Sequence, residues 1–173
     1  MAMHSRFGTR TLVMMALLTA MEIVLSRFLS FSAWNMKIGF AFVPLAAAAI
    51  LFGPAEAAVV GGLSDLLGAL LVPVGPYFPG FTLTAACMGA VLGLLLHKKQ
   101  SLARVCCAVG FNLLVLSLLV NSLWISILYG SPYGGIVAAR LVQCAILAPV
   151  QVCVIGAMAR VFQPMLRRAA AQG

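Results

Sequence analysis

The sequence predicts an all-α integral membrane protein with six transmembrane helices and both termini in the cytoplasm. Apolar residues make up 64% of the 173-residue chain and charged residues only 8%, against about 25% charged in a soluble domain. A chain of this size cannot hide so much apolar surface in one core, so its solvent must be the bilayer. The apolar runs are continuous rather than alternating, which excludes a β-barrel. An ordinary soluble enzyme, a disordered protein and a nucleic-acid-binding domain are excluded as well.

Six apolar runs are predicted to cross the membrane, since each span needs about 20 residues. They lie at about residues 11–31, 38–52, 54–71, 78–96, 105–128 and 136–162. Between them lie a polar break at 32–37, the Gly53-Pro54 turn, a loop rich in proline and glycine, the basic hinge 97–104 and the turn 130–135. Proline suits the first helical position at residue 54, and Pro164 is expected to end the sixth span. Residues 1–173 are predicted to form a single transmembrane substrate-binding domain.

The net charge of +8 is distributed as a topology signal. Cations gather at the N-terminus, in the hinge between the fourth and fifth runs, and at the C-terminal end: Arg6, Arg10, Lys98, Lys99, Arg104, Arg160, Arg167 and Arg168. The segments predicted to lie outside carry a cation only at Lys37. Because cytoplasmic loops are enriched in lysine and arginine, both termini are placed inside. No nucleic-acid partner is expected.

Residues typical of catalysis or metal binding do not form recognisable motifs in this sequence. The five cysteines show no CxxC spacing, so we interpret them as small apolar side chains. Ser64 and Ser126 have no nearby histidine to activate them. Neither an HExxH motif nor an ATP-binding motif is present. We therefore predict no catalytic residue, no metal and no cofactor, and any ATP-driven transport would need another chain to hydrolyse the ATP.

Five charged residues are informative, because they lie within a predicted span or, for Lys37, at its outer start, and a charge near a helix centre costs about 2.5–3.5 kcal/mol. They are Glu22, Arg27, Lys37, Asp65 and Arg140. Counted from the span ends, the three cations share the outer layer of the membrane, Asp65 lies in the middle or outer half, and Glu22 lies near mid-depth.

Aromatic and amide side chains are predicted at a similar depth. The candidate set is Tyr77, Phe78, Phe81, Asn121 and Trp124. Together with the cations and Asp65 they predict an outward-facing pocket for an anionic, partly aromatic small molecule, because arginine binds carboxylates with a planar fork. Two alternatives stay open. The aromatics are also typical of an interfacial belt, and Asp65 is able to pair with Arg27 or Arg140 inside the bundle.

Small residues recur at four-residue spacing in three spans. The sets are Ala16 and Ala20, Ala57 and Gly61, and Ala85, Gly89 and Gly93. Small side chains let membrane helices approach closely. Each set therefore predicts either packing within the chain or a docking face for a partner subunit.

Several segments, taken in order, resemble the substrate-specificity (S) components of energy-coupling factor (ECF) transporters. In the first half they are Leu25-Ser-Arg-Phe-Leu29, Lys37-Ile-Gly-Phe40 and Phe52-Gly-Pro54. The folate-specific branch is resembled by Gly61 to Gly68 with Asp65 inside, by Pro73 with Tyr77-Phe-Pro-Gly-Phe-Thr82, and by Asn121-Ser-Leu-Trp124, Leu128-Tyr-Gly130 and Arg140.

The resemblance implies six helices around a vitamin site near the outer face, capped by the loops after the first and third spans. It also implies a complex with a transmembrane coupling subunit and two cytoplasmic ABC ATPases in a bacterial inner membrane. Ala16 and Ala20 match an AxxxA motif that contacts the coupling subunit in that family. Glu22 stands where a neutral residue is expected.

The leading hypothesis is therefore a folate-binding S component without catalysis of its own. Aromatics would bind the rings of folate, cations its two glutamate carboxylates, and Asp65 the N–H groups of the pterin edge. One alternative is an S component for another anionic nutrient such as pantothenate. The other is a stand-alone proton-coupled secondary transporter that uses Asp65 or Glu22 as a relay.

Overall fold

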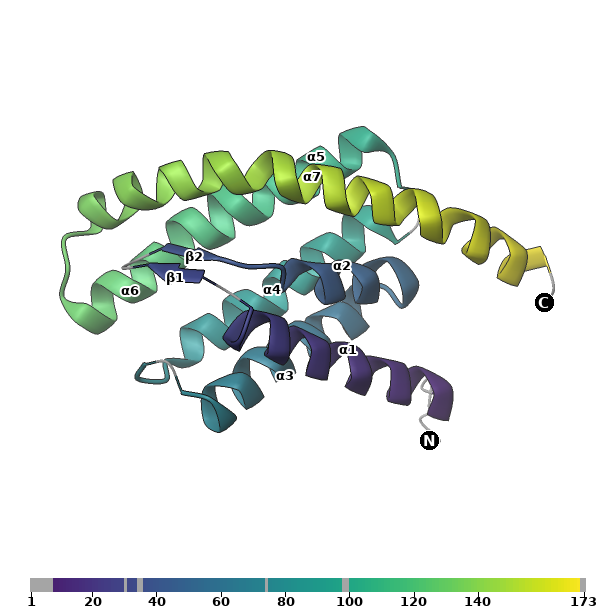
Figure 1. The fold of residues 1–173 in the computed structure, drawn as a ribbon, viewed down its shortest axis with the longest axis horizontal. Coiled ribbons are helices and arrows are strands. Elements are labelled where there is room, and N and C mark those ends of the chain that lie inside the picture. Colours follow the sequence, from purple (N-terminus) through teal and green to yellow (C-terminus); the bar gives the residue numbers. More distant parts are fainter. Residues whose placement is uncertain (1–7, 30, 34–35, 74, 98–99, 172–173) are drawn as a thin grey trace, which may run out of the picture.

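The computed structural model describes residues 8–29, 31–33, 36–73, 75–97 and 100–171. Within these ranges the chain is a bundle of helices with one short hairpin (Figure 1). The elements are α1 (Thr9–Arg27), β1 (Phe31–Ala33), β2 (Met36–Ile38), α2 (Phe42–Leu51), α3 (Pro54–Leu71), α4 (Pro79–Leu96), α5 (Leu102–Phe111), the π-helix η1 (Asn112–Val120), α6 (Asn121–Tyr129) and α7 (Tyr133–Ala171).

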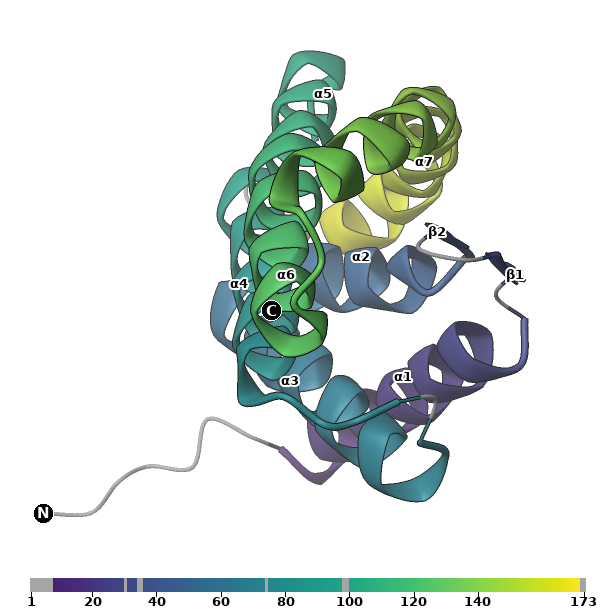
Figure 2. The same cartoon turned by 90° about the vertical axis from the view of Figure 1, so that its left-hand side faces the viewer.

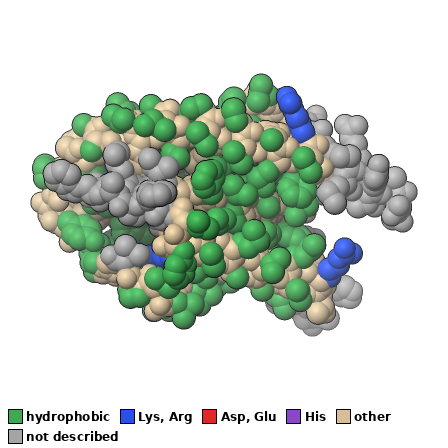
Figure 3. Space-filling model, viewed as in Figure 1, with side chains coloured by type: hydrophobic (Ala, Val, Ile, Leu, Met, Phe, Trp, Pro, Cys, Tyr) green, Lys and Arg blue, Asp and Glu red, His purple; other side chains and the backbone are tan. Residues whose placement is uncertain are grey.

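Five of the described helices are long and apolar enough to cross a bilayer. They are α1, α3, α4, the continuous helix from Leu102 to Tyr129, and α7 as far as Phe162. Hydrophobic side chains are spread over much of the face seen in Figure 3, as expected for a surface that meets lipid. The structure thus confirms the helical membrane class, and the sixth apolar helix, α2, is shorter.

The second predicted span differs most from expectation. Instead of one helix over 38–52, the strands β1 and β2 pair antiparallel with Ser32 opposite Lys37, and α2 begins only at Phe42. Ten residues rise about 15 Å, half the hydrocarbon thickness. The short helix is tolerated because Pro44 to Ile50 are all buried, with α1, α3, α4 and α7 packed around them (Figure 2). Irregular backbone at membrane depth is acceptable where protein surrounds it.

Helices α3 and α4 pack closely through their small residues. A β-carbon at Gly61 would lie 2.5 Å from the carbonyl oxygen of Ala85, and one at Gly89 would collide with the backbone of Ala57. A β-carbon at Gly93 would likewise collide with the backbone of Pro54. Packing within the chain, one of the two readings of these small-residue sets, is therefore confirmed for α3 and α4.

The last two spans also depart from prediction. The helix over 102–129 contains a nine-residue π-helix in its middle, which the apolar run did not indicate. Gly130 ends α6 in the left-handed conformation, with φ 63°, a conformation that glycine adopts without steric cost. Pro164 does not end α7, which continues to Ala171, so the predicted end of that span was wrong.

Both described ends of the chain lie at the same end of the bundle (Figure 1). The basic side chains that stand out in Figure 3 lie mainly at that end too, where Arg10 and Arg160 are exposed. The loop after α3 and the turn at Gly130 lie at the opposite end.

Candidate functional site: an interior polar cavity

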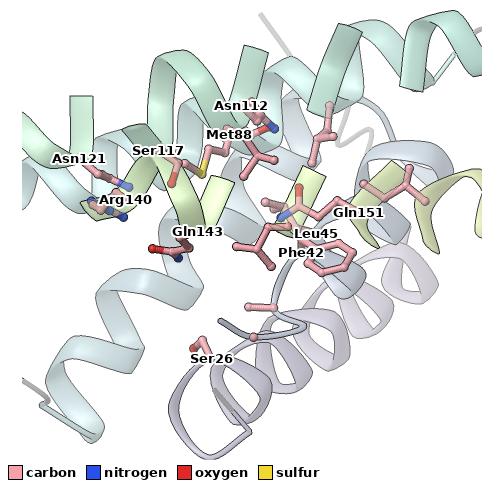
Figure 4. Close-up of a pocket in the computed structure, with 16 residues that line it drawn as sticks. Ser26, Phe42, Leu45, Met88, Asn112, Ser117, Asn121, Arg140, Gln143 and Gln151 are labelled. Atoms are coloured by element: carbon pink, nitrogen blue, oxygen red, sulfur yellow. The ribbon is translucent and has the colours of Figure 1, made fainter. Parts of the chain in front are cut away.

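A cavity of about 250 Å³ lies inside the bundle, between α1, α2, α4, η1, α6 and α7 (Figure 4). Apolar side chains, among them Phe42, Leu45 and Met88, form much of its wall. Polar side chains also reach it: Ser26, Asn112, Ser117, Asn121, Arg140, Gln143 and Gln151. So much polarity at membrane depth is expensive and usually marks a functional site.

The wall on α7 carries one cation among amides. Arg140, Gln143, Leu147, Gln151 and Ile155 all line the cavity, and their spacing of three or four residues places them on one helix face. Arg140 is only 7% exposed, and its Nη1 has no hydrogen-bond partner in the described part of the chain. Its side chain lies beside that of Asn121 (Figure 4). This face therefore offers a buried cationic donor to a solute.

The walls on η1 and α6 carry amides. The Asn112 side chain donates through Nδ2 to the carbonyl oxygen of Met88 at 3.2 Å, which fixes the amide. Its Oδ1, like the Oδ1 of Asn121, is buried without a protein partner among the described residues. A buried polar group left unsatisfied costs about 1–3 kcal/mol. With a buried cation and several amides in its wall, the cavity is suited to a polar molecule that carries a negative group.

Two of the predicted site residues, Asn121 and Arg140, line the cavity. Arg27 does not, although its neighbour Ser26 does. The guanidinium of Arg27 packs against Gly68 on α3, and its Nε is buried without a hydrogen bond to any described group. Lys37 belongs to β2, which contacts α7, but its side chain lies outside the part of the structure that is described.

Asp65 lies outside the cavity wall and takes part in a short polar chain. Thr82 donates a hydrogen bond from Oγ1 to Asp65 Oδ2 at 2.8 Å, and the Tyr77 hydroxyl lies 3.2 Å from the same Thr82 oxygen. Among the described side chains, Asp65 forms no ion pair with Arg27 or Arg140. The carboxylate thus joins α3 to the start of α4.

The predicted aromatic residues gather near this chain, at the start of α4. The ring of Phe78 lies 5.3 Å from that of Trp124 and 6.1 Å from that of Phe81, measured between centroids. Trp124 Nε1 donates to Thr84 Oγ1 at 3.0 Å. None of these rings is part of the cavity wall. They form an aromatic cluster, Phe78, Phe81 and Trp124, beside the cavity residue Asn121.

Glu22 is 8% exposed and faces Ser64 and Asp65 of α3. It is on the same face of α1 as Ser26, one turn away, and its Oε2 has no hydrogen-bond partner in the described chain. The docking candidates Ala16 and Ala20 are exposed, so the bundle does not cover them.

The sequence argument missed Ser26, Asn112, Ser117 and Gln151 as cavity residues. Asn112, Ser117 and Gln151 are neutral polar residues isolated in apolar runs, and Ser26 directly precedes Arg27. These positions were the available signal, but the search followed charged and aromatic residues and a single amide, Asn121.

The fold and the cavity define a class: a helical membrane protein that binds a small polar solute inside its bundle. The family model for the ECF transporter substrate-specific component matches residues 10–158. The chain belongs to this family of solute-binding transport components, and it is not an enzyme.

Known relatives agree in sequence and in structure. The folate transporter FolT of Clostridium novyi (strain NT) is 40% identical over 145 residues, covering 83% of this chain and 84% of the relative. The folate transporter FolT of Leuconostoc mesenteroides is 31% identical over 154 residues, covering 85% and 83%. The crystal structure of FolT bound with folic acid superimposes with a TM-score of 0.85 at 32% identity, covering 90% of this chain and 96% of that one.

Proposed function

We propose that this chain is the folate-binding S component of an ECF-type importer, in which partner subunits use ATP to drive uptake. The observation that carries the proposal is the buried Arg140, which lines a cavity together with Asn112 and Asn121. Folate combines a pterin, rich in N–H donors, with two carboxylates. Its chemistry therefore complements both walls, and the relatives named above are folate transporters.

The proposed site extends beyond the cavity. A volume of about 250 Å³ is below the usual range of about 300–1,000 Å³ for ligand pockets, so it suits one part of a folate molecule. We assign the remainder to the predicted residues that lie outside the cavity wall: Arg27, Lys37, Asp65, Tyr77, Phe78, Phe81 and Trp124. Rings would stack on the aromatic cluster, and cations would bind carboxylates.

The proposed topology has six spans in one domain, with both termini in the cytoplasm of a bacterial cell. Two observations support it: both described chain ends lie at the same end of the bundle, and exposed arginines lie there too. The partners would be a transmembrane coupling subunit and two cytoplasmic ABC ATPases. Ala16 and Ala20 would meet the coupling subunit, since they are exposed on α1.

Binding of folic acid to purified Arg140→Gln tests the proposal. Losing a charge-assisted hydrogen bond costs about 1.5–3 kcal/mol, which is roughly tenfold or more in affinity. Arg160→Gln is the matched control, because Arg160 is exposed and does not line the cavity. The proposal fails if the unmodified chain binds pantothenate and not folic acid. It fails equally if the chain alone, without ATPases, accumulates solute on a proton gradient.

A further inference from the structure

The π-helix η1 interrupts an otherwise regular helix beside the cavity. It covers nine residues, and the N–H of Asn121 still bonds to the carbonyl of Leu116, five residues earlier. Each turn of a π-helix takes more residues than an α-turn, and such segments are rare and frequently found at functional sites. The segment includes Asn112 and is followed by Asn121, and the Oδ1 atoms of both side chains have no hydrogen-bond partner among the described residues.

The wide turns bring together residues that an α-helix would separate. Asn112, Ser117 and Asn121 all line the cavity. At about 100° per residue, a straight α-helix would place Ser117 about 140° and Asn121 about 180° away from Asn112. Regular α-helical geometry would therefore turn the two asparagines to opposite sides of the helix.

The lipid-facing side of the same segment shows the same spacing. Leu114 and Leu119 are 52% and 46% exposed, and they too are five residues apart. Leu116 and Leu118, between them, are buried. Both faces of the segment thus follow the π-helical repeat. The wide turn places the polar residues on the cavity wall and leaves Leu114 and Leu119 on the exposed face.

We propose that η1 is a positioning element for solute recognition, because it places Asn112, Ser117 and Asn121 together on the cavity wall. This proposal rests on the proposed function, since it assumes that the solute enters this cavity. Asn112 is held by Met88 of α4, so the wide turn rotates Ser117 and Asn121 relative to a fixed point. The resulting wall carries two amides and a hydroxyl, groups that suit the polar edge of a heteroaromatic ring or an amide.

A cysteine scan of the segment separates the two helical registers. The five native cysteines are replaced by alanine, and folic acid binding by this background is verified. Single cysteines are then placed at residues 112, 116, 117, 119 and 121 in membrane vesicles and treated with a membrane-impermeant maleimide. We expect modification at 112, 117 and 121, with protection by folic acid, and none at 116 and 119. Leu119→Cys is the matched lipid-facing control.

Modification at 112, 116 and 119, with 117 and 121 unreactive, would follow the α-helical repeat and overturn the proposal. No modification at any of the five positions would overturn it too, because the wall would not face an accessible cavity. Modification at 112, 117 and 121 that folic acid does not prevent, in single-cysteine variants that still bind folic acid, would place the solute elsewhere. That outcome would reject the assigned role of η1 while leaving folate binding by the chain intact.

Discussion

The guanidinium of Arg27 lies against the bare backbone of Gly68, where a β-carbon would be 3.0 Å from Nε. This contact joins the end of α1 to the last turns of α3. Asp65 is three residues before Gly68 on α3, and Ser26, beside Arg27, lines the cavity. Because Gly68 has no side chain, the guanidinium of Arg27 fits against α3 at the edge of the proposed site.

Arg27→Gln is expected to weaken folic acid binding about tenfold or more, because a partly buried cation with a free Nε would be lost. Gly68→Ala should weaken binding less but in the same direction, since the added carbon displaces the guanidinium. Gly62→Ala, where the new carbon would lie 3.5 Å from the Ala86 side chain, is the control and should bind normally. Titration of folic acid by tryptophan fluorescence measures all three. If Arg27→Gln binds folic acid with unchanged affinity, Arg27 only packs against α3 and does not bind the ligand.

Asp65→Asn is expected to lower folic acid affinity about tenfold with little change in thermal stability in detergent. Asparagine still offers an oxygen to the Thr82 hydroxyl, which donates to Asp65 at 2.8 Å, so the tie to α4 survives while the charge is lost. Thr82→Val removes the tie and keeps the charge. If Thr82→Val loses as much affinity as Asp65→Asn, the carboxylate only positions α4.

Gly89→Ala should destabilise the protein by about 1–3 kcal/mol, the usual cost of overpacking, because the new carbon meets the backbone of Ala57. Gly110→Ala is the matched control, since no atom lies within 4 Å of its added carbon. Thermal unfolding of the purified proteins in detergent measures the difference. Equal stability of the two variants would contradict the close packing of α3 and α4.

Ala16→Trp and Ala20→Trp are expected to abolish folate uptake by the assembled transporter while leaving folic acid binding intact. Both residues are exposed on α1, so added bulk obstructs a neighbouring chain without disturbing the bundle. Met21→Trp, also exposed at 46%, turns about 100° or more away from both alanines and should keep transport. Measurements are co-purification with the coupling subunit and uptake of labelled folate. If both Ala16→Trp and Ala20→Trp transport folate fully, this face of α1 contacts lipid and not the coupling subunit.

The sequence predicted correctly those features that depend on the residues of a single helix, such as where the helix begins and ends. The ends of α3 and α4 lie within one residue of the predicted spans, because Pro54 opens the first of these helices and Pro79 the second. The glycine and alanine spacing also predicted their packing. Arg140 was found because a charge within a span is costly wherever its neighbours lie.

Features that depend on several helices at once were not predicted. The strands β1 and β2 and the short α2 are stable because neighbours enclose them, and an apolar run looks the same with or without those neighbours. The π-helix is likewise invisible to a test of α-helical periodicity, since its polar residues follow a wider repeat. Trp124 and Asp65 were predicted to line the pocket, but the packing of side chains put them outside the cavity wall.

The enclosure of α2 separates one wall of the cavity from changes in the surrounding bilayer. Lipid of altered thickness acts on spanning helices by tilting them or deforming the membrane around them. Phe42 and Leu45 line the cavity from a helix whose middle residues touch only protein. Hydrophobic mismatch thus reaches this wall only through its neighbours, whereas the walls on α1, α4 and α7 belong to helices that meet the acyl chains directly.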